Sequence, residues 1–146
     1  MSIKVVGIHH HGIRIDDNNQ SFDDVRAFYA DVLGMGHDTG RPEIASVPGY
    51  WINVGDGGQL HLIGGDLPSV VAVGPGKDAA LPHVALAVED IASAKAWLES
   101  KGADMWVSNA VSPEFEQVFV LDPCGNIIEL HQFDKCRCTS ANRQGA

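Results

Sequence analysis

Apolar and polar residues follow two different periods along this chain, and the change of period divides it into strands and helices. Apolar residues at helical spacing follow Ser21 and Asp90, two good helix N-caps, and stop before the glycines at 34 and 102. Runs rich in β-branched and apolar residues predict β-strands. These runs are 5–15, 50–54, 59–63, 82–88, 105–107, 117–121 and 127–131.

The two halves of the chain repeat one order of elements. Module two at 82–133 reads as a strand, a helix and three further strands. Module one at 5–63 is assigned the same order, although its apolar runs mark only two of the strands after the helix. His10 and His83 occupy matching places on the first strands, at an offset of 73 residues. A five-residue insertion at 18–22 changes the offset to 68 from there onward, and this offset maps His61 onto Glu129.

Four side chains that can bind a metal therefore fall at matching positions of two similar units. Glu129 lies inside the apolar run IIELH, where a buried carboxylate needs a cation or a hydrogen-bonding partner. An outward-facing Glu129, or one paired with an arginine, is the alternative. Because a chance match of all four positions is improbable, the repeat predicts one shared metal site formed by His10, His61, His83 and Glu129.

Strand alternation sorts the neighbours of these residues. It places His10 on one face of its strand and the two flanking histidines on the other. Gln59 and His131 each lie two residues from a predicted ligand, on the same face, so we expect them to orient a ligand or to contact a substrate. Three aromatic residues line the pocket or belong to the ordinary core: Tyr50, Trp51 and Phe119.

Composition and charge narrow the class of protein. The 146 residues, 45% of them hydrophobic and 20% charged, suit one soluble globular domain. A formal net charge of -9 argues against electrostatic binding of nucleic acid or of an anionic membrane. The sequence has neither a membrane-spanning apolar run nor a signal-peptide pattern, so we expect a cytoplasmic protein.

Two segments lack the regular spacing of apolar residues that marks a helix or a strand: residues 64–80 and 134–146. The first is rich in Gly, Pro and Val and predicts a linker or flap between the modules. The second carries Cys136 and Cys138, which could form a metal-binding or redox pair. The polar residues TSANRQGA that follow favour a disordered tail with free thiols.

The motifs IHHHGIRIDD, FYADVLGM, GYWINVGDGGQLHLI and VFVLDPCGNIIEL together resemble the vicinal oxygen chelate superfamily of glyoxalases, bleomycin resistance proteins and extradiol dioxygenases. The resemblance spans residues 8–133. It implies an α+β fold of two βαβββ modules whose mixed sheet curves around a divalent metal. The ligands come from the first and last strand of each module, at the same four positions that the repeat selects.

A set of three imidazoles and one carboxylate favours Ni, Co, Zn or Fe(II). Glyoxalases of this kind commonly have Glu at the position of His61. The resemblance implies a glyoxalase-like lyase or isomerase that acts on a small substrate with vicinal oxygens, with Glu129 as the base. Arg14 matches an arginine with which lactoylglutathione lyases hold the glutathione carboxylate, but residues 62–66 lack the polar and aromatic residues used for glutathione.

The sequence is also compatible with two other functions found in the superfamily. One is an Fe(II)-dependent extradiol-type dioxygenase that uses two histidines and one carboxylate. The other is a small-molecule or drug-binding resistance protein, for which the acidic charge is suitable. Proteins with this resemblance are often dimers, so a homodimer with a small-molecule substrate is expected.

Overall fold

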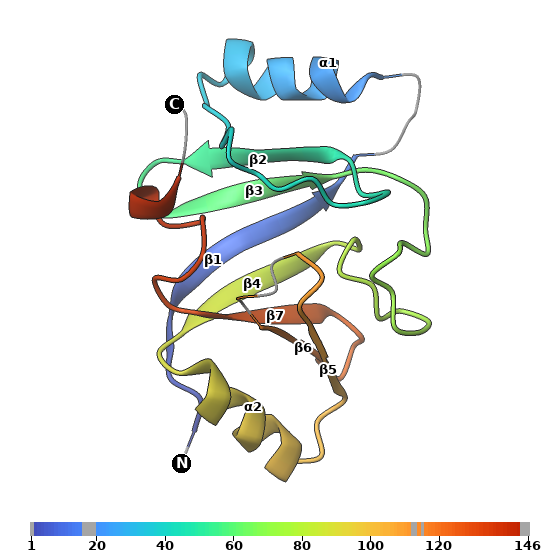
Figure 1. The fold of residues 1–146 in the computed structure, drawn as a ribbon, viewed down its shortest axis with the longest axis vertical. Helices are drawn as coiled ribbons and strands as arrows, with labels where there is room; N and C mark the ends of the chain where they lie inside the picture. The colour runs from blue at the N-terminus through green and yellow to red at the C-terminus, as the bar shows by residue number, and fades with distance from the viewer. Residues whose placement is uncertain (1, 16–19, 112–113, 115, 144–146) are drawn as a thin grey trace.

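The computed structural model describes residues 2–15, 20–111, 114 and 116–143. One seven-stranded mixed sheet forms the centre of the molecule, in the order β2-β3-β1-β4-β7-β6-β5 (Figure 1). Its strands are β1 Val5–Arg14, β2 Gly49–Val54, β3 Gly58–Ile63, β4 His83–Val88, β5 Met105–Ser108, β6 Gln117–Leu121 and β7 Ile127–Gln132. The predicted α+β fold with a mixed sheet is therefore confirmed.

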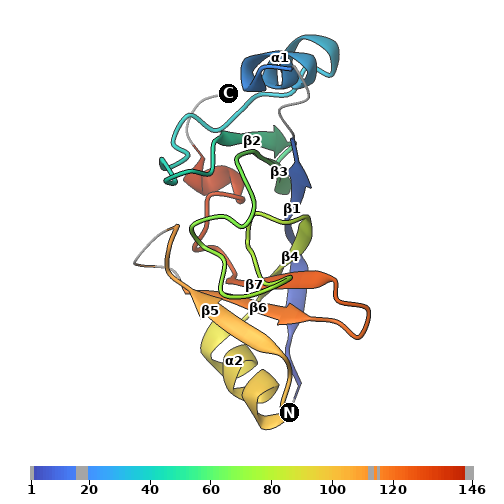
Figure 2. The same cartoon turned by 90° about the vertical axis from the view of Figure 1, so that its right-hand side faces the viewer.

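The helices lie at the two ends of the sheet (Figures 1 and 2). Helix α1 (Phe22–Ala27) begins at Ser21, whose hydroxyl accepts a hydrogen bond from the Asp24 amide, and it continues as the π-helix η1 (Phe28–Val32). Helix α2 (Ile91–Ser100) begins at the predicted cap Asp90. The short 3-10 helix η2 (Ser140–Asn142) lies in the tail. In the described part of the chain, no helix has the length and apolar character needed to cross a bilayer.

The hydrogen-bond ladder reproduces the sequence repeat. His10 pairs with Ala85 and His83 pairs with Gly12 across the antiparallel β1–β4 junction, so the two modules meet symmetrically. The same offsets relate the pair His61–Gly12 in the first module to the pair Glu129–Ala85 in the second. Residues 18 and 19 of the predicted insertion lie outside the described residues.

The first module departs from the repeat at one element. Strand β5 pairs Met105 with Val120 of β6. At the equivalent place in the first module, 68 residues earlier, the described residues form a single bridge between His37 and Ile52 instead of a strand. The edge of the sheet in module one is consequently shorter than predicted.

Alternation along the strands gives the sheet two different faces. One face packs on the helices: Ile52 and Leu62 lie against residues of α1, and Val118 and Leu130 lie against residues of α2. The residues between them point to the opposite face and include the predicted metal ligands. The two helices thus bury the apolar half of each strand and leave the half with the predicted ligands to line a cavity.

The tail is ordered through residue 143, and the prediction of a disordered tail is wrong. Arg137 forms two hydrogen bonds with the buried carboxylate of Asp38, with N–O distances of 2.6 and 2.8 Å. The side-chain amide of Asn142 donates a hydrogen bond to the backbone carbonyl of Cys136 over 2.7 Å. The polar composition misled the prediction because these side chains bond to the protein instead of to water. Residues 144–146 lie outside the described residues.

Candidate metal centre

The histidine run on β1 is bent by a β-bulge. Between Ile8 and His10 the pairing advances by two residues on β1 and by one on β4, from Leu86 to Ala85. The extra residue turns His9 to the same side as His10, and both imidazoles are buried. Strict alternation therefore gave the wrong face for His9, whereas His11 is exposed as predicted.

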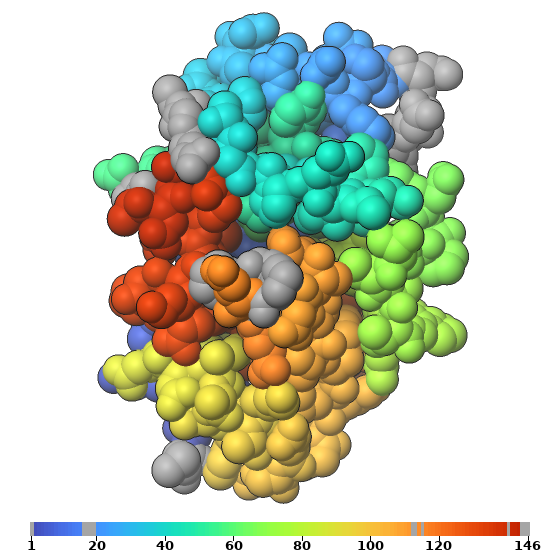
Figure 3. Space-filling view, in the orientation of Figure 1, coloured from blue at the N-terminus to red at the C-terminus, as the bar shows by residue number. Residues whose placement is uncertain are grey.

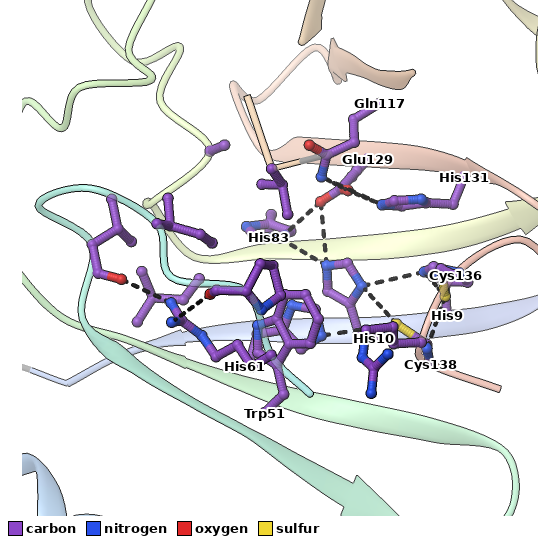
Figure 4. Close-up of a pocket in the computed structure, with 18 of the residues that line it drawn as sticks. His9, His10, Trp51, His61, His83, Gln117, Glu129, His131, Cys136 and Cys138 are labelled. Carbon is purple, nitrogen blue, oxygen red and sulfur yellow. Dashed lines mark hydrogen bonds and ion pairs between the residues drawn. The ribbon is translucent and has the colours of Figure 1, made fainter. Parts of the chain in front are cut away.

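Three of the four predicted ligands converge on one point. The Nε2 atoms of His10 and His83 lie 3.1 Å apart, and Oε2 of Glu129 lies 3.2 Å from the first and 3.0 Å from the second (Figure 4). All three side chains are almost completely buried. They come from β1, β4 and β7, the strands at the centre of the sheet.

Hydrogen bonds fix these donor atoms. The Nδ1 atom of His83 donates to the carbonyl of Leu81 over 2.7 Å, so its Nε2 presents a lone pair to the other two ligands. The second oxygen of Glu129 accepts a hydrogen bond from Nε2 of Gln117 over 2.7 Å and contacts His131. His131 thus contacts a predicted ligand, and so does Gln117, which was not predicted as a site residue. Continuing the β6–β7 register by one residue beyond the pair Val118–Leu130 brings Gln117 opposite His131, and this register is the signal that could have identified Gln117.

His61 does not join this group of three donors. Its ring stacks on that of His10, with ring centroids 3.7 Å apart, and on Trp51 at 4.5 Å. Its Nε2 lies 3.1 Å from Oε1 of Gln59 and 3.8 Å from Sγ of Cys138. His61 therefore lines the same cavity but offers its nitrogen on the other side of His10, where Gln59 orients it.

The remaining predicted residues lie outside the cavity wall. Arg14 donates to the carbonyls of Gly64 and Ala80, at 3.2 and 3.4 Å, and so ties together the two ends of the 64–80 linker. The hydroxyl of Tyr50 donates to Asp23 beside helix α1. Phe119 is fully buried and stacks on Trp106 at 5.0 Å, behind the site. Of the predicted aromatic residues, only Trp51 lines the cavity.

The two tail cysteines line the same cavity as the histidines. Their CxC spacing is the sequence feature that indicates a metal-binding pair. Sγ of Cys136 lies 3.5 Å from Nδ1 of His9, and Sγ of Cys138 lies 3.4 Å from Nδ1 of His10. Burial opposes ionisation of Cys136, but hydrogen bonds with Cys138 and His9 outweigh it and lower its pKa to about 5. Burial raises the pKa of Cys138 well above the usual value.

The cavity has a volume of about 340 Å³, within the usual range for small-molecule sites. Residues of the 40–47 segment, Val71 and Ala80 give it apolar walls, and the histidines and Glu129 form its polar floor. In the space-filling view the tail (red) and the segment near residues 38–48 (cyan) border this face of the molecule (Figure 3). A small ligand with an apolar body and a few polar atoms fits this environment.

The electrostatics of the floor suit a divalent cation. Burial lowers the pKa of His10 to about 4 and that of His61 well below the usual value, which keeps both imidazoles neutral. Burial also opposes charge on His83, but the hydrogen bond that Glu129 accepts, the negative charge of Glu129 and the hydrogen bond to Leu81 together outweigh it and raise the pKa of His83. Burial alone would raise the pKa of Glu129, yet its histidine neighbours hold that pKa well below the usual range.

Comparison with known proteins identifies the family. Residues 7–130 match the model of the glyoxalase/bleomycin resistance protein/dioxygenase superfamily, and the chain belongs to this superfamily. No curated protein matches its sequence.

Two solved structures illustrate the shared fold. Methylmalonyl-CoA epimerase from Mycobacterium tuberculosis has 23% identity and a TM-score of 0.63, over 88% of both chains. A variant of homoprotocatechuate 2,3-dioxygenase from B. fuscum has 18% identity and a TM-score of 0.59, over 90% of this chain and 33% of the dioxygenase. At these identities the likeness shows the fold. The superfamily itself consists largely of metal-dependent isomerases, lyases and dioxygenases, so the specific reaction must be argued from the site.

Proposed function

We propose that this protein is a metal-dependent lyase or isomerase that acts on a small substrate with two adjacent oxygen atoms. The observation that carries the proposal is the meeting of His10, His83 and Glu129, whose donor atoms lie within 3.2 Å of one another on the floor of the cavity. Two imidazoles and one carboxylate occupy one side of a six-coordinate cation and leave positions open for a chelating substrate. Ni, Co, Zn and Fe(II) suit this set of ligands.

The chain's own residues divide the work of such a reaction. A divalent cation at this point supplies a Lewis acid that stabilises negative charge on the substrate oxygens. Among the described residues that line the cavity, Glu129 is the only carboxylate, and we propose it as the group that moves the proton. To accept a proton on the oxygen that faces Gln117 and His131, it must release one of those two contacts.

The apolar walls of the cavity select the substrate. They exclude water from the charged floor, which strengthens the electrostatic interactions there. Arg41 and Arg137 are the cationic side chains among the described wall residues, and Arg137 is paired with Asp38. A small acid or α-oxygenated carbonyl compound suits this combination.

One observation favours a second candidate, an Fe(II)-dependent extradiol-type dioxygenase. His61 offers its nitrogen away from the three converging donors, and the set that remains is the two-histidine, one-carboxylate arrangement of non-haem iron oxygenases. With three protein ligands, a chelating catechol and dioxygen both have a position. The two candidates differ in whether oxygen is consumed.

The test combines metal analysis with two assays on the full chain. The metal content of protein purified without added metal is measured first. Each metal form is then incubated in D₂O with small α-hydroxy and α-keto carbonyl compounds, and deuterium incorporation next to the carbonyl is followed by NMR. Oxygen uptake is measured with catechols. We expect metal-dependent deuterium incorporation, whereas oxygen uptake by the iron form would establish the dioxygenase instead.

Matched variants assign the activity to the site. We expect His83→Ala to lose metal from the three-donor site and to reduce turnover by at least about 100-fold. His11→Ala, which removes an exposed histidine of the same strand, should behave as the wild type. A metal-loaded protein without deuterium exchange or oxygen uptake would contradict both candidates.

A further inference from the structure

A second group of metal-binding atoms lies on the other side of His10 (Figure 4). Nδ1 of His9 and the two sulfur atoms of Cys136 and Cys138 all lie within 4.8 Å of one another. The distance from His9 to Cys136 is 3.5 Å. None of these three residues belongs to the three-donor site of the proposed function.

These distances suit a metal bound by sulfur and nitrogen. Zinc binds cysteine sulfur at about 2.3 Å and histidine nitrogen at about 2.0 Å, so neighbouring donors in a tetrahedral site lie roughly 3.5 Å apart. The separation between His9 and Cys136 has this value, and Cys138 has further imidazole nitrogens 3.4 and 3.8 Å away, from His10 and His61. His61 is placed to supply a fourth ligand in exchange for its contact with Gln59, whereas His10 belongs to the three-donor site through its Nε2.

The thiols are held in place by the structure of the tail. Both are free and buried, and the amide of Cys138 donates to the sulfur of Cys136 over 2.9 Å. Arg137, between the two cysteines, bonds to the buried carboxylate of Asp38, and this anchors the intervening residue. The positions of the sulfur atoms are thus fixed before any ligand binds, which lowers the entropic cost of coordination.

We propose that His9, Cys136 and Cys138 form a second metal site, selective for a thiophilic cation such as Zn²⁺ or Cu⁺. Thiolate ligands favour these cations over the oxygen-seeking ones, and the buried, partly apolar surroundings exclude competing water. The site lies next to the three-donor site, because the ring of His10 presents Nε2 to His83 and Nδ1 to Cys138. The protein accordingly holds two cations of different chemistry, one on each side of His10.

Cadmium is the probe, because a cadmium–thiolate bond has a charge-transfer absorption in the ultraviolet. Fully reduced full-length protein is titrated with Cd²⁺, and Zn²⁺ and Cu⁺ are then added separately as competitors. We expect a saturable band that appears with one equivalent of Cd²⁺ bound to the thiols. Displacement by Zn²⁺ or by Cu⁺ identifies the preferred cation, and either result supports the site.

Variants separate this site from the rest of the protein. The double variant Cys136→Ser/Cys138→Ser should lose the band, and Cys124→Ser, which changes the exposed third cysteine, should keep it. His83→Ala should also keep the band, so that failure of the proposed function does not remove this result. If the double variant does not fold, His9→Ala replaces it, with an expected loss of at least tenfold in Cd²⁺ affinity. A reduced wild-type protein without the band would overturn the proposal, as would a band that is lost only in Cys124→Ser.

Discussion

At the scale of single residues, a glycine fixes the place of His83, one of the proposed metal ligands. Gly12 pairs with His83 across β1 and β4, and the imidazole of His83 lies over the glycine. A Cβ atom at position 12 would lie 2.5 Å from Cε1 and 2.7 Å from Nδ1 of that ring. Because real Cβ atoms do not approach other atoms so closely, only glycine leaves His83 in the position where it meets His10 and Glu129.

We therefore expect Gly12→Ala to weaken metal binding without unfolding the protein. The added methyl group must push the imidazole of His83 away from its partners, and displacement of one ligand should lower metal affinity by about 10–100-fold. Isothermal titration with Ni²⁺ measures the affinity of the three-donor site, and circular dichroism checks the fold. The control is Gly7→Ala on the same strand, where a Cβ atom has no neighbour within 4 Å. Equal affinities for the two variants would contradict the assigned role of Gly12.

The sequence predicted the identity of the residues at the site better than their arrangement. The offsets of the repeat identified His10, His83 and Glu129, because equivalent strands place equivalent residues at the module interface. The inward turn of His9 depends on a bulge, and a bulge adds one residue without a distinctive sequence signal. The position of His61 depends on ring stacking and on Gln59, which are contacts made only after folding.

At the scale of elements, the 64–80 linker is organised around one buried carboxylate. Asp78 accepts hydrogen bonds from the amide and the hydroxyl of Ser69, both at 2.6 Å, and from the amide of Ala80 at 2.9 Å. Burial opposes its ionisation, but the bonds from Ser69 outweigh burial and lower the pKa of Asp78. The linker was predicted from its composition, whereas this internal network needs the folded loop.

We expect Asp78→Asn to reduce the free energy of unfolding by about 2 kcal/mol, because an amide nitrogen would then face groups that need an acceptor. Since the pKa of Asp78 is lower in the folded state, its contribution is present above the unfolded pKa and is lost as pH falls through the folded value. The difference between wild type and variant should therefore shrink below pH ~4. Urea unfolding across this pH range measures it, with the exposed Asp66→Asn as control. A constant difference at all pH values would contradict this explanation.

Most strands and helices could be predicted because their signals are local. Caps, end glycines and apolar periods marked both helices within a residue or two, as the first residues of α1 and α2 show. The missing strand of module one and the ordered tail could not be predicted in this way. The first depends on the 37–52 contact and the second on the pair between Arg137 and Asp38, and both join residues distant in sequence.

At the scale of the whole molecule, the tail joins the two modules around the cavity. It leaves β7 of module two and returns to module one, where Arg137 contacts Asp38. The carboxylate of Asp38 also accepts a hydrogen bond from the amide of Gly40 at 2.9 Å and lies 3.4 Å from Nε2 of Gln59, which orients His61. The tail therefore supports the cavity wall in addition to carrying the two thiols.

We expect Arg137→Ala to loosen the tail and to cost about 2–3 kcal/mol of stability, because Asp38 stays buried while losing two charge-assisted hydrogen bonds. Limited proteolysis should cleave the variant in the tail at least several-fold faster than the wild type. Lys135→Ala, which removes an exposed cation in the same segment, is the matched control. Unchanged proteolysis in Arg137→Ala would show that other contacts hold the tail.

The bulge in β1 has a consequence for how such a protein can change over generations. On a regular strand, adjacent codons specify opposite sides of the sheet, so a binding site can recruit only every second residue. One additional codon near position 9 removes this restriction locally and lets two consecutive histidines enter the same cavity. A single small insertion is thus enough to enlarge the set of donor groups in a scaffold, while the pairing from His10 to Gly12 stays regular.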